Sequence, residues 1–193
     1  MAIVALGITG HRYLIEMDKV MAGVDRAVQR ILGTFPDSNF RVLSSLAEGA
    51  DRILAKRLLL IPNTSLWVPL PVPEEEYLKD FETSESKEEF IYLLGKAERV
   101  INLPVTGKRE EGYLAAGKYV LENSDCLLAI WDGKPAQGAA GTAEIVTMAR
   151  ERGLPLAWVH AGNRNPGTNI PSSLGTEQGK VTFEHLPPPG RKT

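Results

Sequence analysis

The feature that most constrains the fold of this chain is a regular alternation of short apolar runs with amphipathic helical segments. Six runs are typical of buried parallel strands: 2–7, 40–45, 64–71, 99–104, 125–132 and 154–161. Helical patterns lie between them at 16–32, 48–60, 109–123 and 141–153, with two shorter pieces within 72–100 that break near 83–86. Strands that alternate with helices form right-handed parallel βαβ units. We therefore predict an α/β protein with a three-layer, doubly wound Rossmann-like fold and a mostly parallel sheet.

The composition changes after the last of these strands. Residues 162–180 are rich in glycine, proline, asparagine and serine, which is typical of loops, and 181–186 fits one edge strand. The remaining residues resemble a frayed tail. We predict a Rossmann-like domain at 1–161 and a loop-rich C-terminal extension at 162–193.

The charge balance argues against two classes of partner. The chain has 22 basic and 24 acidic residues, a formal net charge of −2, and so no overall field that attracts nucleic acid or an anionic membrane. No run approaches the ~18 apolar residues of a membrane helix, and the N-terminus lacks the pattern of a signal peptide. We expect a cytoplasmic protein without membrane or nucleic-acid partners.

The residues that most often hold metals give no pattern here. Cys126 lies inside an apolar strand run and is expected to be a small buried residue. Nothing accompanies His160 or His185 at the spacing of metal ligands. We expect neither a metal nor a cofactor.

Ligands of open parallel sheets bind beyond the carboxyl ends of the strands, so the loops after the strands are the candidate sites. In the first loop, Gly7 and Gly10 allow a sharp turn and a close approach to a ligand. Thr9 adds a hydroxyl, His11 can donate or accept, and Arg12 offers a forked donor for phosphate or carboxylate. The alternative is an ordinary strand-to-helix turn with solvated polar residues.

The second loop contains the stretch "SSLAEGAD". It places Ser44 and Ser45 at the end of a strand, and Glu48, Gly49 and Asp51 at the start of a helix. Helix capping explains one or two of these residues. A ligand hydroxyl, such as that of ribose, would pair with Ser45 or Glu48, so function and capping both remain open.

The third loop follows the strongest strand pattern and gives the strongest local signal. It contains Asp132, Gly133, Gly138 and Gly141, and then Thr142 and Glu144 at the start of a helix. The small residues leave the approach to that helix nearly free of side chains, so a phosphate can lie against its N–H groups. The alternative is a flexible surface loop.

Taken in order, "GITGHR", "SSLAEGAD" and "DGKPAQGAAGTAEIV" after "DCLLAIW" resemble the SLOG superfamily of Rossmann-like proteins, named for the Smf/DprA and LOG families. "LPVPEEEYLKDF" and "EEFIYLLGKAERVINLP" resemble one bacterial branch of it, and the resemblance covers 1–160. It implies a small-molecule nucleotide or nucleotide-derived ligand, with its phosphate near 138–142 and with Gly7, Thr9 and Gly10 on the other wall. Relatives often pair through helices, so a homodimer is one state that the resemblance allows.

Three functions follow from these observations. The first is a nucleotide-binding or sensing protein in which Arg12 and loop N–H groups hold phosphate while Ser45, Glu48 or Asp132 hold ribose hydroxyls. The second is an N-glycosidase (phosphoribohydrolase) of nucleoside monophosphates, the activity of the LOG branch, with Glu144 or Glu48 as the working carboxylate. The third is a structural Rossmann domain within a larger assembly.

The sequence departs from the LOG signature, a Pro-Gly-Gly-x-Gly-Thr run with a catalytic glutamate three residues after the threonine. Here the double glycine is replaced by Gly138-Ala139-Ala140, and Glu144 follows Thr142 by two residues. One residue turns a helical side chain by ~100°, so Glu144 is expected to point elsewhere. We therefore favour ligand binding over hydrolysis.

Overall fold

The computed structural model describes residues 1–104, 107–135 and 141–190, and this part of the chain contains a seven-stranded sheet. The strands are β1 (Ile3–Gly10), β2 (Asn39–Leu43), β3 (Thr64–Leu70), β4 (Arg99–Asn102), β5 (Cys126–Trp131), β6 (Leu156–His160) and β7 (Val181–Glu184). Their order is β4-β3-β2-β1-β5-β6-β7. The strands β1 to β6 pair in parallel, and β7 is antiparallel to β6. The predicted doubly wound α/β fold with a mostly parallel sheet is confirmed.

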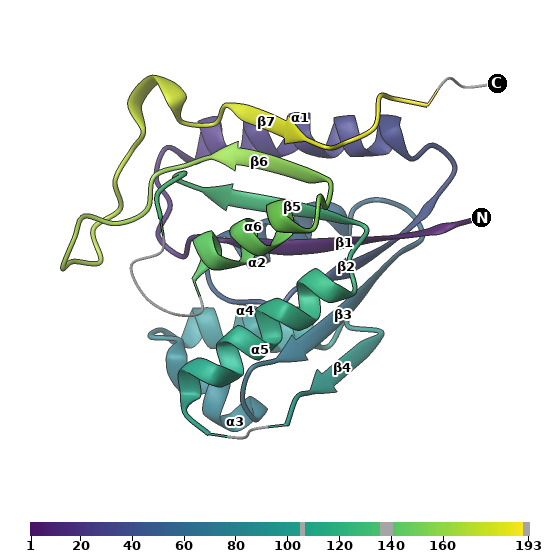
Figure 1. Ribbon diagram of the computed structural model, residues 1–193. Helices are drawn as coiled ribbons and strands as arrows, with labels where there is room; N and C mark the ends of the chain where they lie inside the picture. Colours follow the sequence, from purple (N-terminus) through teal and green to yellow (C-terminus); the bar gives the residue numbers. More distant parts are fainter. Residues whose placement is uncertain (105–106, 136–140, 191–193) are drawn as a thin grey trace.

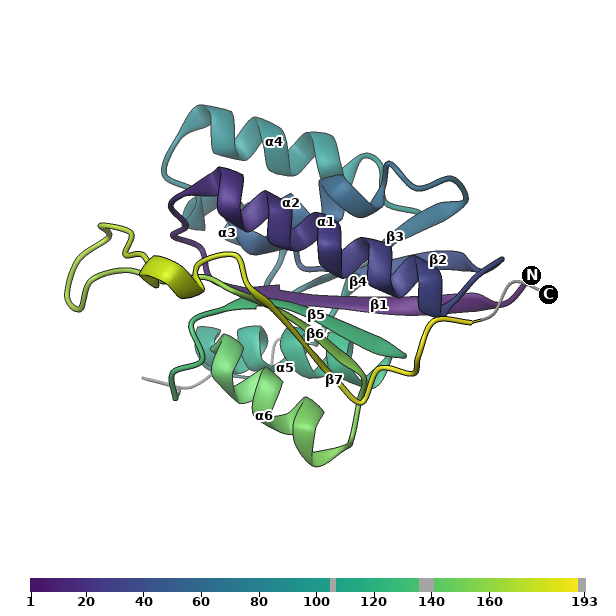
Figure 2. The same ribbon diagram turned by 90° about the horizontal axis from the view of Figure 1, so that it is seen from above.

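Helices cover both faces of the sheet and give three layers. One face carries α1 (Met17–Thr34), α2 (Ala50–Leu58), the short α3 (Glu74–Tyr77) with the 3-10 turn η1 (Leu78–Asp80), and α4 (Ser84–Leu94). The other carries α5 (Arg109–Glu122) and α6 (Thr142–Glu151) (Figures 1 and 2). A second 3-10 turn, η2 (Gly175–Glu177), precedes β7.

The core follows the pattern of apolar residues in the sequence. Every residue of β5 is buried, because this strand lies in the middle of the sheet with helices on both faces. In α1 the buried residues recur at helical spacing: Val20, Val24, Ala27, Val28 and Ile31. Cys126 is fully buried, as expected.

The first strand is longer than the sequence analysis predicts. Its pairing with β5 continues as far as Gly10, which lies opposite Ile130, so the prediction that the strand ends at Gly7 is wrong. Gly7 is required for packing rather than for a turn: a Cβ there would overlap Ser124 Oγ and lie 2.9 Å from Val120 Cγ1. The first loop therefore begins at His11.

The segment after residue 162 is attached to the sheet and to α1. Its strand β7, expected within 181–186, pairs along β6. The Gln178 side chain is buried: its Oε1 accepts from Gly162 N over 3.0 Å, and its Nε2 donates to Ile15 O over 2.9 Å. Arg26 donates to the carbonyl of Gly179 over 2.6 Å. Within the described residues, none of the helices combines the length and the apolar character that a membrane span requires.

Candidate functional site

The candidate site lies where the sheet changes its winding direction. After β1 the chain winds towards β2, whereas β5 occupies the other side of β1. Such a switch point leaves a crevice at the carboxyl ends of β1 and β5, which lie at the left in Figure 1. A cleft of about 600 Å³ opens there. It is lined by residues from β1, β5, α2, α3, α5 and α6, from the loops after β1, β2 and β5, and from the segment after β6.

The centre of the cleft is a contact between the ends of β1 and β5. The backbone N–H of Asp132 donates to His11 Nε2 over 3.1 Å, and Asp132 Oδ1 lies 3.1 Å from the same nitrogen. Burial lowers the pKa of His11, although the charge of Asp132 opposes this effect. The lowered pKa favours the neutral form of the ring. Asp132 Oδ1 accepts in turn from Lys134 N over 3.1 Å.

The loop after β2 is fixed against the loop after β1 by close backbone contacts. Ala50 N donates to His11 O over 3.0 Å. Gly49 has a φ of +80°, and a Cβ there would overlap the carbonyl oxygens of His11 and Arg12. At Gly10, a Cβ would overlap the Cβ of Ala50. Glycines at these two positions let the start of α2 lie directly on the first loop, which brings both loops to one rim.

Two polar side chains, Asp51 and Tyr77, border the end of the cleft nearest α2 and α3. Asp51 is 8% exposed and accepts hydrogen bonds from Ser44 Oγ over 3.0 Å and from the backbone of Ala47. Burial raises its pKa to about 6, against the opposing effect of these hydrogen bonds and of nearby Arg12. Tyr77 is fully buried, which raises its pKa, and its hydroxyl has no hydrogen-bond partner among the described residues.

Basic groups line the cleft from three segments. Arg12 is half-buried, and its guanidinium forms no hydrogen bond or ion pair within the described ranges. Lys134 follows β5 and is exposed. Arg164 is exposed, donates to Asn169 Oδ1 over 3.0 Å and lies 5.4 Å above the Tyr13 ring. The cleft is therefore suited to a ligand with negative charge.

The N-terminus of α6 forms another wall of the cleft. Gly141 precedes the helix with a φ of −94°, and a Cβ placed there would meet nothing within 4 Å. The first N–H groups of a helix have no partner within it, and they carry partial positive charge. Thr142, the first residue of α6, also lines the cleft. The sequence analysis places a phosphate at this point.

The structure brings together eight of the site residues expected from the sequence. Those that line the cleft are Thr9, Gly10, His11, Arg12, Ser45, Asp132, Gly141 and Thr142. Those that do not are Gly7, Ser44, Glu48, Gly49, Gly133 and Glu144, and Gly138 lies outside the described residues.

Several of the residues outside the cleft have a structural role instead. Ser44 is buried and donates to Asp51. Gly133 has a φ of +78°, and a Cβ there would lie 3.0 Å from the indole of Trp158. Glu144 is the third residue of α6, and its backbone N–H donates to Gly141 O over 3.1 Å.

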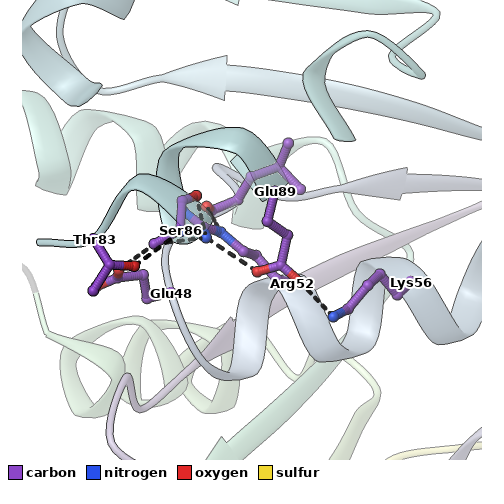
Figure 3. Close-up of polar contacts among 7 residues, drawn as sticks. Glu48, Arg52, Lys56, Thr83, Ser86 and Glu89 are labelled. Atoms are coloured by element: carbon purple, nitrogen blue, oxygen red, sulfur yellow. Dashed lines mark hydrogen bonds and ion pairs between the residues drawn. The ribbon is translucent and has the colours of Figure 1, made fainter. Parts of the chain in front are cut away.

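Glu48 belongs to a polar network between α2 and α4 rather than to the cleft (Figure 3). Its Oε1 accepts from Ser86 Oγ, and Ser86 N donates to Thr83 Oγ1 over 3.1 Å at the start of α4. Arg52 donates to the Ser86 carbonyl over 2.8 Å and to Glu89 over 3.1 Å. The carboxylate that the sequence offered for ribose or catalysis therefore contacts another helix.

Tyr77 and Tyr113 line the cleft but were missed as site residues. From the sequence, Tyr77 is assigned only to one of the short helical pieces within 72–100. One signal could have found it: Tyr77 lies in the connection after β3, and the rule for strand ends applies to that connection too.

Comparison with known proteins adds no family to this description. No protein-family model matches the sequence, and no curated protein matches it. Within the ranges that the structure describes, no group of three or more His, Cys, Asp or Glu side chains is placed to hold a metal ion.

Proposed function

We propose that this protein binds a phosphorylated small molecule of the nucleotide type across the switch point, as a binding or sensing protein of the SLOG kind. The observation that carries the proposal is that Arg12 and the open N-terminus of α6 line one cleft from opposite sides of the switch. Among the described residues the Arg12 guanidinium has no hydrogen-bond or ion-pair partner. An anion between these two groups would satisfy both.

The chemistry of the walls supports a phosphate. A guanidinium binds phosphate with two parallel hydrogen bonds, and helix N–H groups bind its remaining oxygens. Lys134, from the same β5–α6 connection as the helix N-terminus, adds a second positive charge. Since Arg12 and these two groups come from two different loops, the site can select a phosphate by its position as well as by its charge.

The size and the apolar walls support an organic group attached to that phosphate. A volume of about 600 Å³ lies within the usual range for small-molecule sites. Tyr13, Tyr113 and Trp131 contribute aromatic surface to it. Aromatic rings are suitable partners for a planar base, so a nucleotide fits this combination better than phosphate alone.

The geometry favours binding over hydrolysis by the two glutamates that the sequence offered. Glu48 accepts a hydrogen bond from Ser86 of α4, and neither Glu48 nor Glu144 lines the cleft. A catalytic group must lie within hydrogen-bond reach of the reacting atom. We therefore expect ligand binding without release of a free base.

The proposal is tested by calorimetry and thermal unfolding with ribose 5-phosphate and with the common nucleoside mono- and diphosphates. A ligand at 100 times its dissociation constant stabilises the folded state by ~2.7 kcal/mol, which is easily detected. We expect Arg12→Ala to weaken binding about 10-fold or more, as loss of a charged hydrogen bond does. Arg152→Ala removes an equal charge from the exposed end of α6, where Arg152 pairs with Glu122, and should change nothing.

A second variant tests the wall at α6 without altering charge. Gly141→Val should fold normally, because its φ of −94° suits any residue and its Cβ position is open. It should weaken binding by covering the helix N–H groups. Equal affinity in Arg12→Ala and Arg152→Ala, or no stabilisation of the wild type by any of these compounds, would overturn the proposal. Chromatography of the same mixtures would reveal a released base.

A further inference from the structure

The end of the cleft formed by Asp51 and Tyr77 has unused hydrogen-bonding capacity. The Tyr77 hydroxyl is fully buried and has no partner among the described residues. An unpaired hydroxyl in such a position is costly, and buried polar groups in native proteins are nearly always paired. Because Tyr77 borders the cleft, a ligand can supply the missing partner.

Asp51 offers complementary capacity beside it. The carboxylate has about four positions for accepting hydrogen bonds, and the hydroxyl of Ser44 and the backbone of Ala47 use two of them. Asp51 itself borders the cleft and acts electrostatically on Tyr77, so the two groups face a common region. A ligand group placed there meets the ionised Asp51 carboxylate, which can only accept hydrogen bonds, and the Tyr77 hydroxyl, which can donate or accept them.

The surrounding charges decide which ligand group fits. Arg12 acts on both Asp51 and Tyr77, and Arg52 does the same from the side of α2. Asp80 adds a negative charge near Tyr77. A ligand ammonium would be opposed by the two arginines, and a second carboxylate or phosphate by the two aspartates. A neutral hydroxyl is repelled by neither the arginines nor the aspartates, and it can donate to Asp51 and accept from Tyr77.

We propose that the Asp51–Tyr77 end of the cleft binds a neutral sugar hydroxyl of the ligand. This inference rests on the proposed function, which places the phosphate between Arg12 and the N-terminus of α6. The ligand then lies across the switch point, with its phosphate towards β5 and its sugar hydroxyl towards β2. In this proposal Asp51 and Tyr77 bind the sugar hydroxyl that the sequence analysis assigned to Ser45 or Glu48, because the Glu48 carboxylate contacts Ser86 of α4.

The test compares two probes, inorganic phosphate and ribose 5-phosphate, the unit that nucleoside 5′-monophosphates share. Calorimetric titration gives the ratio of their dissociation constants for each variant. We expect the wild type to bind ribose 5-phosphate more tightly than phosphate. In Tyr77→Phe, affinity for ribose 5-phosphate should fall about 10-fold while affinity for phosphate is unchanged, since only the hydroxyl subsite is altered.

The stability of the ligand-free protein gives a second readout. Because the Tyr77 hydroxyl has no protein partner among the described residues, Tyr77→Phe should unfold at the same temperature as the wild type or higher. Tyr92→Phe makes the same chemical change at a tyrosine of α4 that is 62% exposed, and serves as the matched control. Asp51→Asn should lose the preference for ribose 5-phosphate as well.

The outcomes separate this inference from the proposed function. If the wild type prefers ribose 5-phosphate and both variants keep that preference, the hydroxyl subsite is wrong and phosphate binding stands. If Tyr77→Phe loses affinity for both probes equally, the hydroxyl has a structural role and the subsite is also wrong. If the wild type binds ribose 5-phosphate no more tightly than phosphate, the subsite is wrong, and if in addition no nucleotide stabilises the wild type, the proposed function falls with it.

Discussion

The backbone N–H of Asp132 donates a hydrogen bond to Nε2 of His11 over 3.1 Å, and this contact joins the carboxyl ends of β5 and β1. These strands are neighbours at the point where the winding of the sheet reverses. The His11 side chain is 10% exposed and that of Asp132 is 9% exposed, so water reaches the pair only poorly. Both residues line the cleft.

This relationship predicts the protonation state of His11. Burial lowers its pKa below the usual 6.5, so the ring is neutral at pH 7. Nuclear magnetic resonance titration of the ring should give a midpoint below 6.5. A midpoint above 6.5 would instead mean that the Asp132 carboxylate dominates.

The stability of the protein should respond to the same group with a definite sign. A histidine with a lowered pKa in the folded state binds its proton more tightly when unfolded. The contribution of neutral His11 to the free energy of unfolding is therefore complete above pH 6.5, and it is lost as the pH falls towards the pKa of the folded state. His11→Gln, which keeps an acceptor but does not titrate, should lose less stability than the wild type over that interval.

Asp51 should have the opposite effect on stability, over a different range of pH. Its pKa is about 6 in the folded state and 3.8 ordinarily, so the folded protein binds the proton more tightly. The wild type should lose stability as the pH rises from about 4 to about 6. Asp51→Asn avoids the buried charge and should be more stable than the wild type by roughly 3 kcal/mol above pH 6.

Urea unfolding of both proteins from pH 4 to pH 8 measures this difference, and other titrating groups cancel in the comparison. The difference should be small at pH 4 and should reach its full size near pH 7. A difference that stays constant with pH would show that folding does not change the pKa of Asp51, and that burial does not disfavour its charged form.

The fold was predictable because the burial of each strand is a local property of the sequence. A continuous apolar run such as 126–131 fits a strand covered on both faces, and six strand-like runs alternating with helices leave few alternatives. The end of β1 was not predictable in this way. Gly7 resembles a strand end, but its lack of a side chain makes room for Ser124 and Val120 of the α5 region. That requirement depends on contacts more than 100 residues away.

The site was predictable in location but not in the direction of its side chains. Loops after β1, β2 and β5 do meet, because parallel strands end at one edge. By sequence, Glu48 and Ser45 were equally good candidates for binding a ligand hydroxyl. The Glu48 carboxylate accepts instead from Ser86, which lies 38 residues further along the chain. Tyr77 gives no local sign that its hydroxyl lacks a partner. Such facts depend on tertiary neighbours, which a sequence pattern does not contain.

Gly141, which lines the cleft, and Gly49, which packs under the first loop, should differ sharply in their tolerance of a side chain. Gly49→Ala requires a Cβ at a φ of +80° and against the carbonyls of two residues in the first loop, so we expect a loss of about 2–4 kcal/mol. Gly141→Ala has an ordinary φ and open space, and should lie within about 0.5 kcal/mol of the wild type. Chemical denaturation of the two variants measures both. Similar stabilities would refute the close contact between the first two loops.

The last prediction concerns two cations that bind one carboxylate, as Figure 3 shows for Arg52 and Lys56 on Glu89. Arg52 is 2% exposed, donates to Leu46 O over 3.0 Å and lies 4.4 Å above the Phe81 ring, whereas the Lys56 side chain is 50% exposed. Arg52→Ala leaves buried acceptors unpaired and should cost about 3–5 kcal/mol, while Lys56→Ala should cost about 0–1 kcal/mol. Urea unfolding at neutral pH distinguishes the two. Equal losses would mean that α2 and α4 are held together by their apolar contacts alone, and that the loop carrying Ser45 does not depend on Arg52 for its position.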